Sequence, residues 1–256
     1  MTQRLNTSQR SKGGFWPTLL AWVSVLTLFI AVLLMAGAGP AYRWQLLGLG
    51  EAFALLRNGV YAAAGAMLLS LILLVVSGIT RRFRAGVVAV VVMAATLALL
   101  YSPWQQWQRA QQAPVIHDIT TDMQNPPVFT ALKDAREAAP NAVDYPGEAS
   151  ARQQRAAYPN VQPLVVDGPV KRVLAAAQAE VEASGWQVAA ITENTLEATA
   201  TTQWFGFEDD VVIRLTEQQD AVRVDMRSAS RLGASDIGTN AQRIETFLTA
   251  LRERLE

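Results

Sequence analysis

Hydrophobic and polar positions divide the 256-residue chain into two parts with different periodicities. The first part contains three uncharged apolar runs, at about residues 15–39, 59–78 and 85–101. A helix of a soluble protein would show polar residues at helical spacing, and these runs show almost none. A hydrocarbon core needs about 17–25 apolar residues to be crossed by a helix. The pattern therefore predicts a three-helix transmembrane region within residues 15–104.

The second part has the periods of a folded domain. Apolar residues recur at helical spacing from Val170 to Val181, between Asp167 as the expected N-cap and Gly185 as the stop signal. A second amphipathic helix is expected from Ile244 onwards. Between the two helices, alternating residues predict four strands, at about residues 186–190, 196–201, 209–215 and 221–227.

Successive strands of this kind predict an antiparallel meander with one covered face. Since two amphipathic helices are available to cover it, the expected fold of residues 114–256 is α+β, an antiparallel sheet with two packed helices. Residues 1–14 are expected as a tail and 105–113 as a polar linker. Residues 140–163, rich in Ala, Pro, Gln and Arg, are expected as a long surface loop.

The opposite face of the sheet would carry charged side chains. Arg223, Asp225 and Arg227 alternate with apolar residues in one predicted strand. This face is either a solvated surface with cross-strand charge pairs or a polar platform for a ligand, and the sequence leaves both open.

Charge is divided as unevenly as hydrophobicity. Of 22 basic and 22 acidic side chains, nine basic and one acidic lie in residues 1–112, which leaves thirteen basic and twenty-one acidic in residues 113–256. A net negative domain repels phosphates, so no nucleic acid is expected as a partner. The chain has no cysteine, which excludes a disulfide framework.

Short loops predict the topology. Basic residues gather before the first span and between the second and third: Arg4, Arg10, Lys12, Arg81, Arg82 and Arg84. The positive-inside rule then gives a multi-pass protein of the bacterial inner membrane, with a cytoplasmic N-terminus and a periplasmic C-terminal domain. Ala36-Gly37-Ala38 resembles a signal peptidase site, and cleavage after Ala38 would leave the remaining spans oriented as before. No Asp, Glu, Lys or His interrupts the spans, which favours an anchor over a transporter.

Residues 227–244, RSASRLGASDIGTNAQRI, connect the last strand to the last helix. The glycine spacing is that of a phosphate loop, but Thr239 stands where the lysine is required. Ile237 stands where a nucleophile elbow around Ser235 needs its second glycine. Helix capping by Ser235 or Asp236 explains a part of the segment.

Capping leaves several polar residues of this segment unexplained: Arg227, Ser228, Ser230, Arg231, Asn240 and Arg243. Two interpretations stay open. The arginines hold acidic partners within the domain, such as Asp209, Asp210 or Asp225, or they join free helix-terminal amides to bind an anion.

A second polar cluster, HDITTD, contains His117, Asp118 and Asp122. Together with the acidic turn around Asp209 and Asp210 it offers oxygen ligands, but a zinc site needs more His or Cys, and the carboxylates lack calcium-loop spacing. No metal and no cofactor is therefore predicted. Local turn hydrogen bonds that dock this segment are the expected role.

Three separated blocks carry a family resemblance: HDITTD followed by NPPVF, then TTQWFGFEDDVVIR, then DMRSASRLGASDIGTNAQRI. Over about residues 114–253 the chain resembles domain-of-unknown-function family 1499, which implies bacterial envelope-associated proteins, often behind membrane spans, and plastid proteins. The resemblance implies no activity, cofactor or catalytic residue. The matching positions are His117, Asp118, Thr121, Asp122, Phe205, Asp209, Asp210, Arg227, Ser228, Ser230, Arg231, Gly233, Asp236, Gly238, Asn240 and Arg243.

Two functional hypotheses follow. The first is a membrane-anchored binding or structural module of the envelope, whose partners are the lipid bilayer and an envelope protein, an anionic lipid or a small anion. The alternative is an envelope hydrolase of phosphoesters or glycans, with His117 and Asp122 or Asp209 as acid and base. Candidate ligand-binding residues are His117, Asp118, Asp122, Asp209, Asp210, Arg227, Ser228, Ser230, Arg231, Asp236, Asn240 and Arg243.

Overall fold

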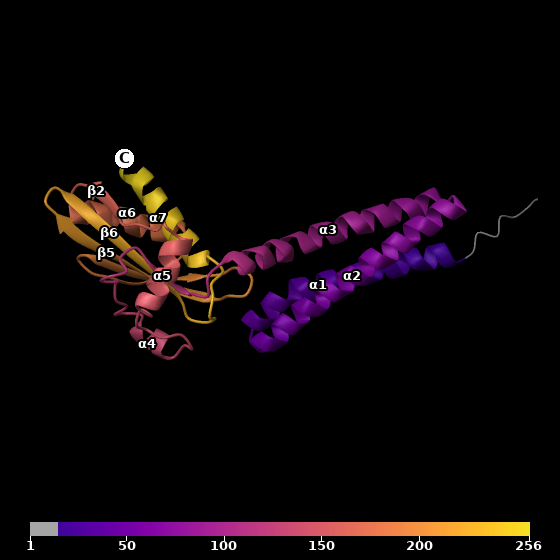
Figure 1. Ribbon diagram of the computed structural model, residues 1–256, viewed down its shortest axis with the longest axis horizontal. Coiled ribbons are helices and arrows are strands. Elements are labelled where there is room, and N and C mark those ends of the chain that lie inside the picture. Colours follow the sequence, from indigo (N-terminus) through magenta and orange to yellow (C-terminus); the bar gives the residue numbers. More distant parts are fainter. Residues whose placement is uncertain (1–14) are drawn as a thin grey trace, which may run out of the picture. The chain divides into compact units, whose positions relative to one another are not determined.

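The structure is a computed structural model that describes residues 15–256. The predicted tail, residues 1–14, lies outside the described residues. The chain divides into two compact units, residues 1–105 and 106–256, whose helices and strands are drawn in Figure 1. Each unit has its own architecture.

Three long helices form the first unit: α1 (Trp16–Arg43), α2 (Leu49–Thr80) and α3 (Phe83–Gln112). Each is long and apolar enough to cross a membrane. The helices extend beyond the apolar runs because polar flanking residues also continue the helix. Residues 105–112, expected as a linker, form the last turns of α3.

Small residues bring α1 and α2 together. Ala31, Ala38 and Ala63 are fully buried. A Cβ at Gly59 would collide with the Met35 side chain and would lie 3.1 Å from the Met35 backbone nitrogen. Close approach of two backbones at small residues is the usual way in which helices pack within lipid.

The second unit is built on one antiparallel sheet. The strands are β1 (Asp118–Thr120), β2 (Leu164–Asp167), β3 (Gln187–Ile191), β4 (Thr195–Thr201), β5 (Glu208–Gln218) and β6 (Ala221–Ser230). Their order is β1-β6-β5-β4-β3, and β2 also pairs with β6. The predicted meander from β3 to β6 is confirmed. The short strands β1 and β2 were not predicted, and they divide the free edge of β6 between them.

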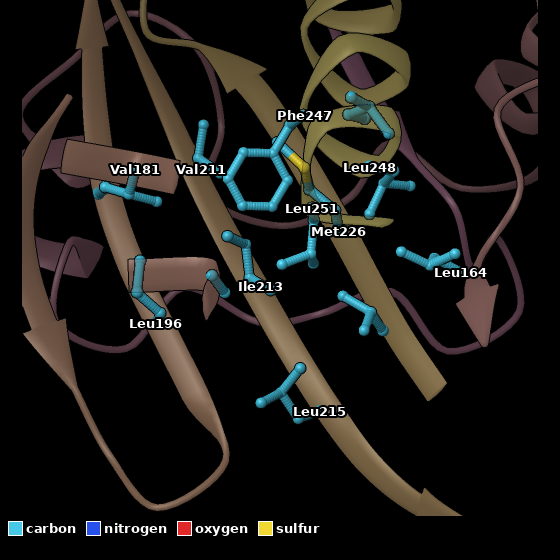
Figure 2. Close-up of a cluster of buried hydrophobic side chains, with 14 of the residues drawn as sticks. Leu164, Val181, Leu196, Val211, Ile213, Leu215, Met226, Phe247, Leu248 and Leu251 are labelled. Carbon is cyan, nitrogen blue, oxygen red and sulfur yellow. The ribbon is translucent and has the colours of Figure 1, made fainter. Parts of the chain in front are cut away.

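Helices α6 (Val170–Ala183) and α7 (Thr239–Leu255) cover the apolar face of this sheet, as predicted. Figure 2 shows side chains of α7 meeting those of the strands in the core, and its labelled members are Leu164, Val181, Leu196, Val211, Ile213, Leu215, Met226, Phe247, Leu248 and Leu251. Each such large side chain contributes about 1.5–3 kcal/mol by its burial.

The start of α6 differs from the prediction. Pro169, and not Asp167, is the N-cap residue. Asp167 is the last residue of β2 and pairs with Ala221, so its backbone is extended. Gly168, at φ +116°, makes the turn between strand and helix.

The other face of the sheet is also covered. Two short helices, α4 (Lys133–Glu137) and α5 (Glu148–Ala157), and their connections lie against it. Phe129 and Leu132 pack on Val212 and Ala229 there. This face is therefore enclosed around Arg227, whereas the predicted cross-strand charge pairs appear at its other end, where Arg214 and Arg223 are 23% and 32% exposed. The sequence pattern did not predict that α4, α5 and their connections cover this face, because much of their contact with the sheet is polar and leaves no apolar periodicity.

Candidate functional site

Strand register determines which polar side chains meet. Opposed residues of antiparallel strands point to the same face. The register therefore gathers the following side chains on the face turned away from α6 and α7, which we call the polar face: Asp118, Glu197, Thr199, Asp210, Arg214, Asp225 and Arg227.

The central contact of the polar face is a bidentate ion pair between β1 and β6. Arg227 donates from Nε to Asp118 Oδ1 at 3.0 Å and from Nη2 to Asp118 Oδ2 at 2.8 Å. Two further N–H groups of the guanidinium reach the backbone carbonyls of Pro127 and Val143. Both charged side chains are at most 3% exposed. This ion pair is therefore enclosed within the domain.

A second buried network joins β5, α4 and the end of β6. Asp210 accepts hydrogen bonds from Arg136 at 3.1 Å, from Arg231 at 2.8 and 2.9 Å, and from Thr199 at 2.9 Å. The pKa of Arg136 is lowered by burial, an effect that Asp210 partly offsets. The hydrogen bond to Asp210 raises the pKa of Arg231. One carboxylate thus holds two arginines.

One aromatic ring contacts two of the buried arginines. The guanidinium carbons of Arg136 and Arg227 each lie 4.7 Å from the centre of the Phe129 ring. Burial raises the pKa of the neighbouring Tyr145 to about 12. Cation–π contact with the negative face of a ring is favourable where water is excluded, so the ring reduces the repulsion between two buried cations.

The third network contains Asp122. Arg214 donates to Asp122 at 3.0 Å and to Asp225 at 3.2 Å, and Arg223 donates to Asp225 at 2.9 and 3.0 Å. Asp122 also accepts backbone N–H bonds from residues 124 and 125. Local turn bonds were predicted for Asp118, Thr120 and Thr121. Thr120 makes such bonds, with the backbone of Asp122, whereas Asp118 and Thr121 instead bond Arg227 and Asp225, more than 100 residues away.

The carboxylate of Glu197 has a similar role. It accepts backbone N–H bonds from Thr130, Ala131 and Leu132 at 2.9–3.0 Å. Three amides on one carboxylate fix the segment that leads into α4 on the sheet.

A separate polar corner lies on the other side of the sheet, where β6 leads into α7. Asn240 bonds Ser228 at 2.6 Å, Ser230 at 3.0 Å and the backbone carbonyl of His117 at 3.0 Å. Arg243 bonds Ser228 at 2.9 Å and pairs with Asp209 at 2.5 Å. These bonds tie the helix to β6, β5 and the start of β1.

The N-terminus of α7 already holds an anionic group. Gly238, at φ +85°, is the N-cap residue. Asp236 accepts the amide hydrogens of Gly238 at 2.9 Å and of Asn240 at 2.8 Å. Burial raises the pKa of Asp236, an effect that these amide bonds oppose. The cap is therefore supplied two residues before the helix boundary, and Ser235 instead bonds the carbonyl of Pro114.

His117 is the candidate with an unsatisfied side-chain atom. Its ring is half-buried, and within residues 15–256 its Nδ1 has no hydrogen-bond partner. Burial lowers its pKa, and Asp118 and Asp236 oppose the shift. The structure places Asp122 in the Arg214 network and Asp209 on Arg243, so neither carboxylate bonds the ring.

Each arginine of residues 227–244 therefore has a carboxylate partner inside the domain. Asp209 and Asp210, which the sequence suggested, hold Arg243 and Arg231. Arg227 takes Asp118 in place of Asp225. Sequence reasoning missed Arg136, which lies in a segment that looks like an exposed, charged helix.

Comparison with known proteins gives a family and no activity. A family model described as "Protein of unknown function (DUF1499)" matches residues 118–251. Among curated proteins, none matches the chain. The matched region begins at β1 and ends within α7, so it contains all three ion-pair networks of the polar face and the corner at α7.

Proposed function

The chain belongs to the DUF1499 family, and from that premise we propose that it is a membrane-anchored structural and binding module of the bacterial envelope. In this proposal the three helices hold a rigid domain at the outer surface of the inner membrane. The domain presents its surface to other envelope components and performs no reaction.

The observation that carries the proposal is the internal pairing of the polar signature. Asp118, Asp210 and Arg136 are fully buried or nearly so, and each forms an ion pair inside the domain, although the Nε of Arg136 has no hydrogen-bond partner among the described residues. An external anion would have to displace a carboxylate that is already desolvated and bidentate. Removing one partner of such a pair is strongly unfavourable, so the geometry favours a structural role for these side chains.

The hydrolase alternative has less support. A general acid and base need two titratable groups with separated pKa values beside the substrate. His117 is the only histidine of the chain, and the two carboxylates suggested for it are engaged with arginines. Binding of an anionic ligand at the start of α7 also has little support. The amide hydrogens that such a ligand would need, those of Gly238 and Asn240, are already bonded to Asp236.

Binding and turnover measurements on the full chain in lipid nanodiscs test this proposal. Inorganic phosphate is titrated into wild type, Arg231→Ala and the control Arg252→Ala, which alters an exposed arginine of α7. We expect no phosphate binding that depends on Arg231 and no turnover of ester, phosphoester or glycan substrates. Binding that is lost only in Arg231→Ala, or turnover that is lost in His117→Ala, would overturn the proposal.

The orientation needs its own test. Alkaline phosphatase, which matures only outside the cytoplasm, is fused after Glu256, and a green fluorescent protein fusion at the same point serves as the reciprocal reporter. The positive-inside rule predicts an active phosphatase and a dark fluorescent fusion. The reverse pattern would place the domain in the cytoplasm and would contradict the envelope assignment.

A further inference from the structure

The hairpin between β4 and β5 carries an unusual concentration of aromatic residues. Residues 202–207 read TQWFGF, and we call them the aromatic loop. The Trp204 side chain is 43% exposed. Phe205 beside it is only 9% exposed, so the loop combines one buried ring with one exposed indole.

Local bonds hold the aromatic loop in one shape. Thr202 and Phe207 are joined by a backbone bond of 2.9 Å and by a bond of 2.8 Å from the Phe207 amide to the Thr202 hydroxyl. Gly206, at φ +73°, closes the turn. The rings of Phe205 and Phe207 stack with centres 5.0 Å apart, and Trp204 meets Phe205 edge-on at 5.1 Å. The loop is therefore preorganised, which lowers the entropic cost of a contact.

The register places the aromatic loop at a particular end of the sheet. Thr201, the last residue of β4, pairs with Glu208, the first of β5. Asp209 pairs with Ser230 at the end of β6, and Asp118 at the start of β1 pairs with Ala229. The aromatic loop thus leaves the sheet at the same end at which the chain enters the domain from α3.

The connection between α3 and the sheet is short. Asp118 follows the last residue of α3, Gln112, by six residues, which reach at most about 20 Å when fully extended. The end of the sheet that carries the aromatic loop is therefore within this reach of the end of α3, whose last turns follow the apolar run at residues 85–101. A short tether makes contact with the same bilayer effectively intramolecular.

The chemistry of the aromatic loop suits the bilayer interface. Tryptophan and other aromatic rings concentrate at the level of the lipid headgroups, because one side of the ring is apolar and the other can be wet. Residues 202–207 carry no charge, so no ionised group has to be desolvated. Val115, which is 69% exposed, adds an apolar side chain in the segment that enters the same end.

We propose that the aromatic loop inserts into the headgroup region of the bilayer that the three helices cross. The domain then has two attachments, the covalent one through α3 and a reversible one through Trp204 and its neighbours. This fixes which surface of the domain faces away from the membrane. The proposal goes beyond the structural role suggested above and depends on the membrane anchor alone, not on the side of the membrane.

Site-directed spin labelling provides the test, because a chain without cysteine accepts single labels. A nitroxide is attached at Gln203→Cys in the aromatic loop and, as a control, at Gln218→Cys, an exposed position in the hairpin at the other end of β5. The full chain is reconstituted in phosphatidylcholine vesicles. Collision rates with oxygen, which partitions into lipid, and with a water-soluble nickel chelate are compared.

We expect the label at position 203 to have a ratio of oxygen to nickel collisions several-fold higher than the label at 218. Trp204→Ser should move the ratio at 203 toward the aqueous value, whereas Trp204→Phe should retain most of it. An unchanged spectrum at 218 confirms that each variant is folded. A ratio at 203 equal to that at 218 would overturn the proposal, and so would low collision rates with both reagents, because that result means that the loop packs against protein.

Discussion

Among single residues, the arginines of the domain differ in how completely they are enclosed. Arg136 is fully buried, and Arg227 is nearly so. Arg231 lies at the edge of the Asp210 network, where 18% of its side chain is exposed. A buried cation is costly unless it is paired, so Arg136 and Arg227 depend on their carboxylates and on nearby carbonyls.

His117 gives the domain a pH dependence. Its folded-state pKa is lowered by burial, so as pH falls through about 6.5 the unfolded chain takes up the proton first, and the free energy of unfolding falls. Below the folded pKa the loss stops. In His117→Gln we expect this loss to disappear, measured as urea midpoints between about pH 5 and pH 7.5. An identical pH slope in both proteins would show that His117 is not the responsible group.

Some polar partners of single residues could be predicted from the sequence and others could not. Asp209 and Asp210 could be suggested as arginine partners because an acidic turn follows a strand. Arg136 and Glu197 could not, because their partners are 74 and 65 to 67 residues away in sequence and their segments show no apolar periodicity. Long-range polar contacts leave no local pattern.

Among the elements, α7 depends on a cap that precedes it. Asp236→Ala removes the carboxylate that accepts hydrogen bonds from two backbone amides at the start of the helix. This should lower the free energy of unfolding by about 1–2 kcal/mol. Asp236→Asn keeps one acceptor oxygen and should cost less. Glu245→Ala, at an exposed position of the same helix, is the control. Equal unfolding free energies for Asp236→Ala and Glu245→Ala would mean that the cap contributes nothing.

The close contact between α1 and α2 leads to a prediction for the stability of the first unit. Gly59→Ala places a Cβ against the Met35 side chain and 3.2 Å from the Ala31 carbonyl, which should cost about 1–3 kcal/mol through overpacking. Gly78→Ala, also in α2, meets nothing within 4 Å and serves as the control. The free energy of unfolding of both variants is measured in mixed detergent micelles. If Gly59→Ala is as stable as Gly78→Ala, the close approach at Gly59 is absent.

Helices and strands were predicted correctly where a regular apolar pattern extends over many residues. The four strands of the meander and the helices α6 and α7 follow directly from alternation and helical spacing. The strands β1 and β2 are three and four residues long, too short for a period to be recognised. Helix α5 lies inside residues that were expected to form a surface loop. It was not predicted because its buried side contains polar residues such as Gln154, so no apolar stripe marks the helix.

On the scale of the whole molecule, the sheet has one apolar and one polar interface. The apolar interface with α6 and α7 follows from binary patterning. The polar interface is assembled from residues 118–136 and 197–231, which no local rule brings together. Most of the family signature lies in this interface and at the corner at α7, with Phe205 of the aromatic loop as an exception, which explains why motif chemistry suggested an active site where the side chains pair with each other.

The most direct test of this framework is a double-mutant cycle on Asp118 and Arg227 in the full chain. Asp118→Ala and Arg227→Met should each lower the free energy of unfolding by about 3–5 kcal/mol, because each leaves a buried charge unpaired. The double variant should lose clearly less than the sum, with a coupling of about 2–3 kcal/mol. Small and additive losses would contradict the account, since two side chains that do not depend on each other are free to bind a ligand.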